Sequence, residues 1–240
     1  MIFLTYIPLL LLVLLLSTLV RKRSYKIVPC FFAYAAFAVA ADIARFVTHS
    51  HHPTYRLTYW ITEAGYDLLG ILVMYEVLRT VLGSLTRAWW SRLIFPGVLI
   101  SGIGMSIARA NVVPSRLSGI EFYIAVGEIA VRFVQVFVFA GLVTLVPLLG
   151  LRWRQYPFGV ATGFGLYATV MLLATTKFSD FGTRFKLLWG WTSLVAYSVA
   201  VLIWIWFFSV PQKASTPNSE LSAPSAGDLK QYKDALRRMR

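Results

Sequence analysis

The stretch MIFLTYIPLLLLVLLLSTLVRKR (residues 1–23) sets both the class of fold and the direction of the chain. Its first twenty residues carry no charge, and Arg21, Lys22 and Arg23 follow at once. About 20 apolar residues suffice for a helix to cross a bilayer. Basic residues next to a span favour the cytoplasm, so we predict a spanning helix over 1–20 with its N-terminus outside. The stretch has neither a basic leader nor a small-residue cleavage site, which favours a retained helix over a signal peptide.

Six further apolar stretches follow this first one, and we predict that each spans the membrane: 27–47, 58–80, 93–110, 122–149, 158–176 and 187–210. The apolar runs are continuous rather than alternating, which indicates helices and not a transmembrane barrel. Hydrophobic residues make up 58% of the chain and charged residues only 14%, against roughly 25% charged residues in soluble domains. The sequence therefore predicts an all-α, polytopic membrane protein with a bundle of about seven helices over 1–210.

Basic residues gather in the short segments between the apolar runs, and the net charge is +13. This is the positive-inside pattern of membrane proteins rather than a phosphate-binding groove, so we expect no nucleic-acid partner. The segments on the side of Arg21, together with the C-terminal tail, hold more than twice the lysine and arginine of the other side. The C-terminus is therefore predicted to lie in the cytoplasm. We expect the chain to be a multi-pass protein of a bacterial inner membrane. Tryptophans near the span ends, Trp204 and Trp206 among them, are typical of residues at the membrane interface.

The C-terminal tail divides into two parts. Residues 211–227 are rich in Pro, Ser, Ala and Thr and predict a flexible linker. In 228–240, apolar residues recur at helical spacing among the basic side chains Lys230, Lys233, Arg237, Arg238 and Arg240. A short basic amphipathic helix on anionic lipid headgroups is one interpretation, and a solvated, unstructured tail is the other.

Ionisable residues inside the predicted spans give the most information about function. Each such group costs several kcal/mol at membrane depth, so it faces the bundle interior and finds a partner. Asp42, Arg45, Glu63, Asp67 and Glu128 fall in the outer halves of their spans, and Arg132 lies near the middle of its span, with Gln135 one turn further. The predicted ligand-binding pocket comprises Asp42, Arg45, Glu63, Asp67, Glu128, Arg132, Gln135 and Tyr197. With every acid ionised, four acids and two bases leave an excess of negative charge. Such a pocket would suit a cationic ligand or a metal ion, or one acid would hold a proton.

A structural interpretation of the same residues competes with the pocket. Arg132 with Glu63 or Asp67, and Asp42 with Arg45, would be interhelical ion pairs that fix helix register and bind nothing. Glu76, nearer the inner end of its span, is expected to pair locally with Arg79. Pairs of small residues four apart, Gly97 with Ser101 and Gly159 with Gly163, predict close helix contacts.

No cofactor is expected from these residues. Seven spans with an outside N-terminus resemble, in topology, the microbial rhodopsins and the G-protein-coupled receptors. Retinal needs a lysine inside the last helix, whereas Lys186 lies at its edge. Haem b bundles and the zinc amidases of the alkaline ceramidase type need histidines within helices, but all three histidines lie in the predicted external loop, 48–57. The single cysteine, Cys30, permits no disulfide within the chain.

The sequence predicts a sensor-like or receptor-like bundle with an outward-facing charged pocket. Its overall plan resembles the membrane sensor parts of bacterial signalling proteins, and a membrane or cytoplasmic protein partner would read its state. A proton or small-cation transporter and an accessory subunit of a larger membrane complex are the alternatives. We do not expect an enzyme, because no nucleophile, base and orienting group occur together in the sequence.

Overall fold

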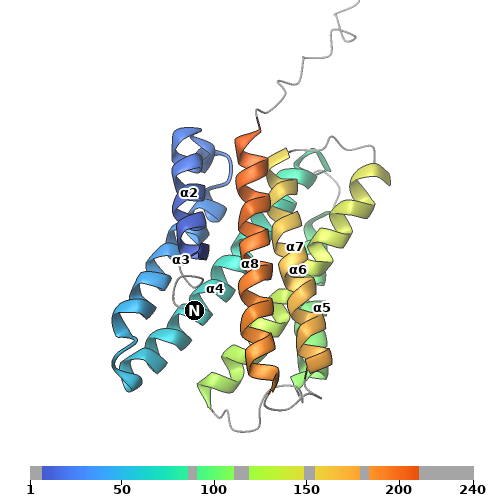
Figure 1. Cartoon of the computed structure of the whole chain (residues 1–240). Coiled ribbons are helices and arrows are strands. Elements are labelled where there is room, and N and C mark those ends of the chain that lie inside the picture. The colour runs from blue at the N-terminus through green and yellow to red at the C-terminus, as the bar shows by residue number, and fades with distance from the viewer. Residues whose placement is uncertain (1–6, 86–90, 111–118, 149–154, 179–183, 211–240) are drawn as a thin grey trace, which may run out of the picture. The chain divides into compact units, whose positions relative to one another are not determined.

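The computed structural model describes residues 7–85, 91–110, 119–148, 155–178 and 184–210, and the helix is its main element (Figure 1). Two short 3₁₀ helices, η1 (Ser24–Lys26) and η2 (Leu82–Leu85), lie between longer ones. The α-helices are α2 (Ile7–Arg21), α3 (Pro29–Thr48), α4 (His52–Val81), α5 (Ser91–Ala108), α6 (Ile120–Leu148), α7 (Gln155–Phe178) and α8 (Arg184–Ser209). These seven helices occupy the seven ranges predicted from the apolar runs. The predicted all-helical class is therefore confirmed for the described part of the chain.

Four helical segments are long and apolar enough to cross a membrane: Pro29–Thr48, Ile120–Leu148, Gln155–Thr175 and Gly190–Ser209. The described parts of two further apolar helices, Ile7–Arg21 and Leu93–Ala108, are shorter. Large apolar side chains also project outward, such as those of Leu10, Val47 and Ile100, each more than half exposed. So much exposed apolar surface is costly in water and suits a lipid environment. The helices thus indicate a membrane protein.

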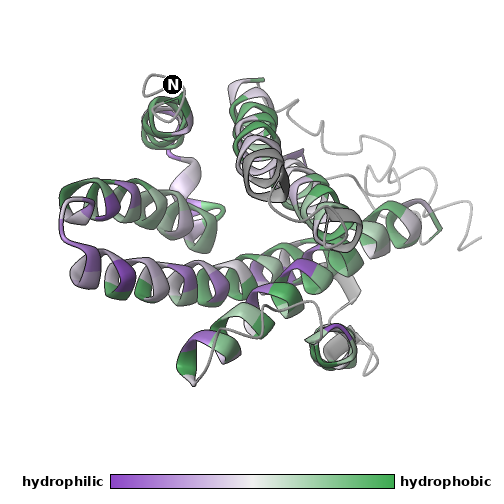
Figure 2. Ribbon diagram, turned by 60° about the horizontal axis from the view of Figure 1, so that its bottom comes forward, coloured by the Kyte–Doolittle hydropathy of each residue, from purple (hydrophilic) through white to green (hydrophobic). Residues whose placement is uncertain are grey.

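Two antiparallel hairpins organise the bundle. Helices α3 and α4 lie side by side and are joined by a tight turn at His49–His51, where Figure 2 shows hydrophilic colour. Pro53 lies in the first turn of α4, a position where a missing backbone N–H costs nothing. Helices α7 and α8 form the second hairpin (Figure 1). Helix α6 packs against α4, α5 and α7, while α2 packs against α3 and α8.

One end of the bundle is filled by aromatic side chains from α3, α7 and α8. Phe31 stacks on Phe208 with ring centroids 5.5 Å apart, and it meets Trp204 edge-on at 5.1 Å. Phe164 lies 4.8 Å from Trp204 between centroids. Trp204 is fully buried, and its indole N–H donates to the Val160 carbonyl at 3.2 Å. The ring of Trp204 therefore packs in the core between helices, and its N–H finds a backbone partner there.

Several helix ends in this half are capped by side chains from neighbouring helices. The Glu76 carboxylate of α4 accepts the backbone N–H of Cys30 at 3.0 Å and of Phe31 at 3.1 Å, both in the first turn of α3. The expected local pair of Glu76 with Arg79 is therefore replaced by a cap, because α3 begins at a proline and has no side-chain cap of its own. At the other hairpin, Lys22 donates to the Ser209 carbonyl, and Gln155 donates to the Phe207 carbonyl at 3.0 Å.

Small residues permit close helix contact, although not everywhere that the sequence predicted. Gly159 and Gly163 of α7 lie directly under the rings of Phe207 and Trp204 of α8, which confirms the predicted close contact. In α5 the pair Gly97 and Ser101 was the wrong choice, since Gly97 has open space around it. The contact with α6 is made instead by Gly102, whose face packs against Val134 and the Ala130 carbonyl.

The predicted linker and tail, 211–240, lie outside the described residues, with Lys230, Lys233, Arg237, Arg238 and Arg240. So do Arg87, Arg116, Arg152 and Arg154, which contributed to the predicted orientation of the chain.

Candidate functional site

The opposite half of the bundle contains a cleft of about 1070 Å³. Its walls come from α2, α3, α4, α6, α7 and α8, at the end where α3 and α4 are joined. All eight residues predicted for the pocket line it: Asp42, Arg45, Glu63, Asp67, Glu128, Arg132, Gln135 and Tyr197. Helix–helix contacts explain this meeting, since α3 and α4 run antiparallel while α4 and α6 run in the same direction. The charged segments of three helices therefore reach the same level.

Arg45 joins α3 to α4 on one side of the cleft. Its Nη2 lies 2.9 Å from Oε1 of Glu63, and its Nε donates to the Thr62 hydroxyl at 2.8 Å. The guanidinium also lies over the ring of Tyr59, 4.8 Å from the centroid. The predicted pairing of Arg45 with Asp42 on its own helix was wrong, because the antiparallel hairpin brings Glu63 opposite Arg45. One guanidinium is thus shared by the Glu63 carboxylate and the Thr62 hydroxyl.

Arg132 takes a partner on its own helix, α6. Its guanidinium pairs with the Glu128 carboxylate one turn earlier, and the arginine is buried with only 6% of its surface exposed. The sequence had suggested Glu63 or Asp67 as the partner, across to α4. The spacing of four residues explains the outcome, because it stacks the two side chains on one face of a helix.

Asp42 and Asp67 are left as the surplus acids of the cleft. Neither makes a hydrogen bond or an ion pair within 4 Å with another residue that the structure describes. Asp67 faces α6, and its Oδ2 lies 3.4 Å from the position that a β-carbon on Gly127 would occupy. The cleft therefore holds two ion pairs, with partners other than those that the structural interpretation named, and they use two of its four acids. The cleft keeps an excess of carboxylates over bases.

Gln135 lies one turn deeper than Arg132 and is also buried, with 6% of its surface exposed. Its amide Nε2 is close to Gly70, which leaves room on α4 for the side chain. Its Oε1 has no hydrogen-bond partner among the described residues. The Tyr197 hydroxyl of α8 faces Tyr34 but makes no hydrogen bond of good geometry. Buried polar atoms are normally paired, so the Gln135 oxygen and the Tyr197 hydroxyl are exceptional.

Aromatic residues that the sequence analysis missed form the floor of the cleft. Tyr34, Tyr66, Phe164 and Tyr167 all line it. Tyr34 meets Phe164 edge-on at 4.9 Å, and Tyr167 meets Tyr197 at 5.7 Å between centroids. One signal was present in the sequence: these tyrosines fall well inside predicted spans, away from the interface where tyrosine is usual. A hydroxyl at that depth indicates a polar interior.

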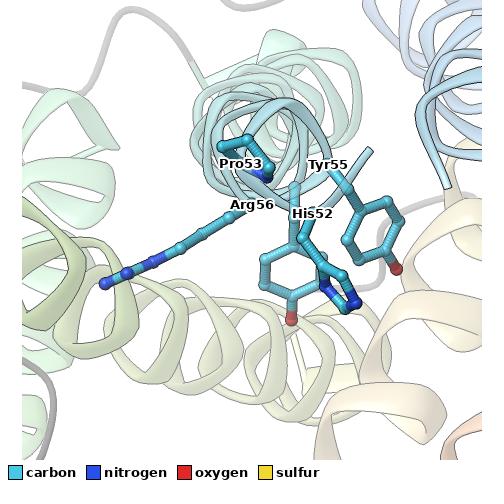
Figure 3. A pocket seen from close by; sticks show the side chains of 5 residues that line it. His52, Pro53, Tyr55 and Arg56 are labelled. Atoms are coloured by element: carbon cyan, nitrogen blue, oxygen red, sulfur yellow. The ribbon is translucent and has the colours of Figure 1, made fainter. Parts of the chain in front are cut away.

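A smaller hollow of about 550 Å³ adjoins the turn between α3 and α4 and is lined by His52, Pro53, Tyr55, Arg56 and Tyr59 (Figure 3). Tyr55 belongs to both hollow and cleft and contacts the His49 ring edge-on. Arg56 extends to the other side of α4, where its Nη2 lies 2.6 Å from Oε1 of Glu121 on α6. This hydrogen bond and the charge of Glu121 raise the pKa of Arg56, which stays protonated.

The histidines of the turn, His49, His51 and His52, are exposed. Within the described ranges, no three groups among His, Cys, Asp and Glu come together in a way that would hold a metal ion. Cys30 lies at the far end of the bundle from the cleft, in the first turn of α3, with an unoxidised thiol.

Comparison with protein families, with curated proteins and with solved structures found no match for this chain. Any assignment of function therefore has to start from the cleft and its chemistry.

Proposed function

We propose that the chain is a receptor-like membrane protein that binds a small molecule in the cleft between α3, α4, α6 and α8. The main support is that eight polar or charged residues from four helices line one cleft of about 1070 Å³. Ligand pockets are typically concave, largely apolar and equipped with a few convergent polar groups. The size and lining of the cleft fit this description. Binding would act as a signal by favouring one arrangement of the helices over another.

Transport is less well supported than binding. A relay of protons or cations toward the other face would use Glu76, the acid nearest that end of α4. Both carboxylate oxygens of Glu76 instead accept backbone N–H groups of α3, so this acid serves the fold. Beyond the cleft, the aromatic core around Trp204 and Phe208 packs tightly. These two features favour a site that is open on one side.

We infer the remaining architecture from the sequence. The bundle spans a bacterial inner membrane seven times, with the N-terminus and the cleft on the outer side. The linker 211–227 leads to the basic tail 228–240, whose Lys230, Lys233, Arg237, Arg238 and Arg240 would contact anionic headgroups or a cytoplasmic partner. The supporting pattern is the excess of lysine and arginine on that side.

The test compares two variants of α8 that differ by one position. Ser193 lines the cleft, whereas Thr192 lines a shallow apolar hollow between α7 and α8. Ser193→Trp would fill the cleft, and Thr192→Trp is the matched control. A panel of cationic, neutral and anionic small molecules is screened against the purified full-length protein in detergent, with the melting temperature as the readout. We expect at least one compound to stabilise the parent and the Thr192 variant but not the Ser193 variant.

Two outcomes would contradict a ligand-binding cleft. In the first, no compound of any charge class stabilises the parent. In the second, stabilisation persists in Ser193→Trp, which would place binding elsewhere on the protein. Ligand that binds only the folded state stabilises it by mass action, so a millimolar panel detects sites down to millimolar affinity.

A further inference from the structure

We propose that the cleft takes a small organic ammonium ion, with Asp67 as its counter-ion, Gln135 Oε1 as a hydrogen-bond acceptor and the tyrosine floor around its apolar body. This inference rests on the proposed function, since it names the class of ligand for the same cleft. The proposed ligand carries a positively charged nitrogen on a carbon skeleton. Metal ions, carboxylates and neutral molecules are the competing occupants.

The balance of charge is the first reason. Arg45 and Arg132 each lie against their own carboxylate, Glu63 and Glu128. Asp67 lines the same cleft without an ion pair to a described residue. A carboxylate at membrane depth without a base is costly, and a bound cation would offset that cost. An anionic ligand would add to the surplus of negative charge.

Gln135 supplies an independent reason. Gln135 lines the cleft with 6% of its surface exposed, and its buried Oε1 has no hydrogen-bond partner among the described residues. An unpaired buried acceptor costs about 1–3 kcal/mol, and a donor from a ligand would remove that cost. The Gln135 amide lies beside Gly70, about one helical turn along α4 from Asp67. Both acceptors call for N–H donors, which an ammonium group carries.

The floor of the cleft and its size argue for an organic body. Tyrosine and phenylalanine rings attract cations over their faces and pack against apolar groups, and Tyr34, Phe164 and Tyr167 provide both surfaces. A cleft of about 1070 Å³ is far larger than a bare metal ion needs. Metal coordination also requires several ligating oxygens around one point. The described residues gather no three such groups.

The experiment uses probes that share a body and differ in charge. Phenethylamine, phenethyl alcohol and phenylacetate are titrated against the full-length protein in detergent at neutral pH, with choline as a second ammonium ion and Ca²⁺ and Zn²⁺ as metal probes. The readout is the shift in melting temperature with concentration. We expect at least one ammonium probe to stabilise the parent, with the alcohol and the carboxylate clearly weaker.

Three variants assign the effect to the named groups. Asp67→Asn keeps the shape of the side chain and should weaken the ammonium probe by roughly tenfold or more. Gln135→Leu removes the acceptor and should weaken the same probe while leaving the protein folded. Glu121→Gln changes an acid outside the cleft and should bind like the parent. Each variant is first shown to elute as a single species, and Gln135→Leu carries the test if Asp67→Asn does not fold.

The failures can be told apart. If phenylacetate, the alcohol or a metal ion stabilises the protein in a way that Ser193→Trp abolishes, while no ammonium probe does, the cleft binds ligands but the ammonium assignment is wrong. If ammonium probes bind equally to the parent, Asp67→Asn and Gln135→Leu, the assignment is also wrong. If no probe of any class depends on the cleft, the proposed function fails together with this inference.

Discussion

Glu76 stabilises the fold, although a buried acid without hydrogen-bond partners would destabilise it. It lies in the last two turns of α4, is 9% exposed, and accepts hydrogen bonds from two backbone N–H groups of α3. The first N–H groups of a helix have no partner within that helix, and water is scarce at membrane depth. Glu76 therefore supplies to α3 what a serine or aspartate at the N-cap supplies in a soluble protein.

Replacing Glu76 should be the most damaging single change at an acidic position. Glu76→Ala leaves two buried N–H groups without acceptors, and each lost partner costs about 1–3 kcal/mol. We expect a loss of roughly 2–4 kcal/mol in the free energy of unfolding, with Glu76→Gln intermediate because one oxygen remains. Denaturant titration of the purified protein in mixed micelles measures this. Glu121→Ala is the control and should change stability less, because its partner is an exposed arginine that water can solvate rather than two backbone N–H groups of a helix end. Equal losses in the two variants would contradict the capping role.

The sequence identifies which charged residues lie within the predicted spans, but it does not identify their ion-pair partners. The positions of Asp42, Glu63 and Arg132 in their apolar runs were enough to predict that they share a level. Their partners depend on the rotation and offset of each helix, which the apolar pattern does not specify. Helices buried on several sides carry little difference between their faces, so the spacing of charges was the only guide. The sequence analysis paired Arg132 with Glu63 or Asp67, although the spacing of four residues from Glu128 already favoured the pair that forms. Nothing in the spacing indicates Arg45 with Glu63.

At the scale of elements, the two hairpins are held together in different ways. The α3–α4 hairpin is joined by polar contacts, from the Arg45–Glu63 pair near the turn to the Glu76 cap at the far end. The α7–α8 hairpin relies on close packing, with glycines of α7 under the rings of Phe207 and Trp204. Association in lipid depends on such van der Waals contact, because lipid tails are as apolar as the helices.

A single methyl group should therefore weaken the α7–α8 hairpin. The β-carbon of Gly163→Ala would fall on the indole of Trp204, which is fully buried among Phe31 and Phe164 and has no free space. Overpacking of this kind costs about 1–3 kcal/mol. Gly97→Ala is the matched control, because a β-carbon there meets nothing within 4 Å. Alanine also favours the helix over glycine, so this variant should be neutral or slightly stabilised. Denaturant titration of both variants in micelles tests the order, and a Gly163→Ala protein as stable as the parent would contradict the packing.

The apolar runs predicted the helices well because each run must be long and unbroken to replace water by lipid. The structure extends α4 back to His52, six residues before its predicted start. Pro53 lies in the first turn of α4, where a proline begins a helix as readily as it ends one. The wrong pair in α5 has a similar cause. Gly97 with Ser101 and Gly102 with Ser106 have the same spacing, and only the position of α6 decides which face is covered.

At the scale of the whole bundle, polar and apolar interiors occupy opposite ends. The cleft with its surplus carboxylates lies where α3 meets α4, and the aromatic core and the helix caps lie at the other end. This division suits a protein that is rigid on one side and receives a ligand on the other. Capping by Lys22 and Gln155 at the end of α8 ties α2 and α7 to the helix that leads into the tail.

The direction of the bundle in the membrane can be tested because the chain has one cysteine. In a Cys30→Ala background, Thr54→Cys places a thiol at the exposed start of α4 and Lys26→Cys places one at the exposed basic turn after α2. The excess of basic residues near Lys26 predicts that this turn is cytoplasmic. A membrane-impermeant maleimide should therefore label the Thr54 variant in intact cells and the Lys26 variant only after permeabilisation. The reverse pattern would place the cleft inside the cell, where its ligand would have to be a cytoplasmic molecule. Labelling of both sites in intact cells would mean that the α2–α3 connection and the α3–α4 turn lie on the same side of the membrane. A membrane-spanning α3 does not allow this.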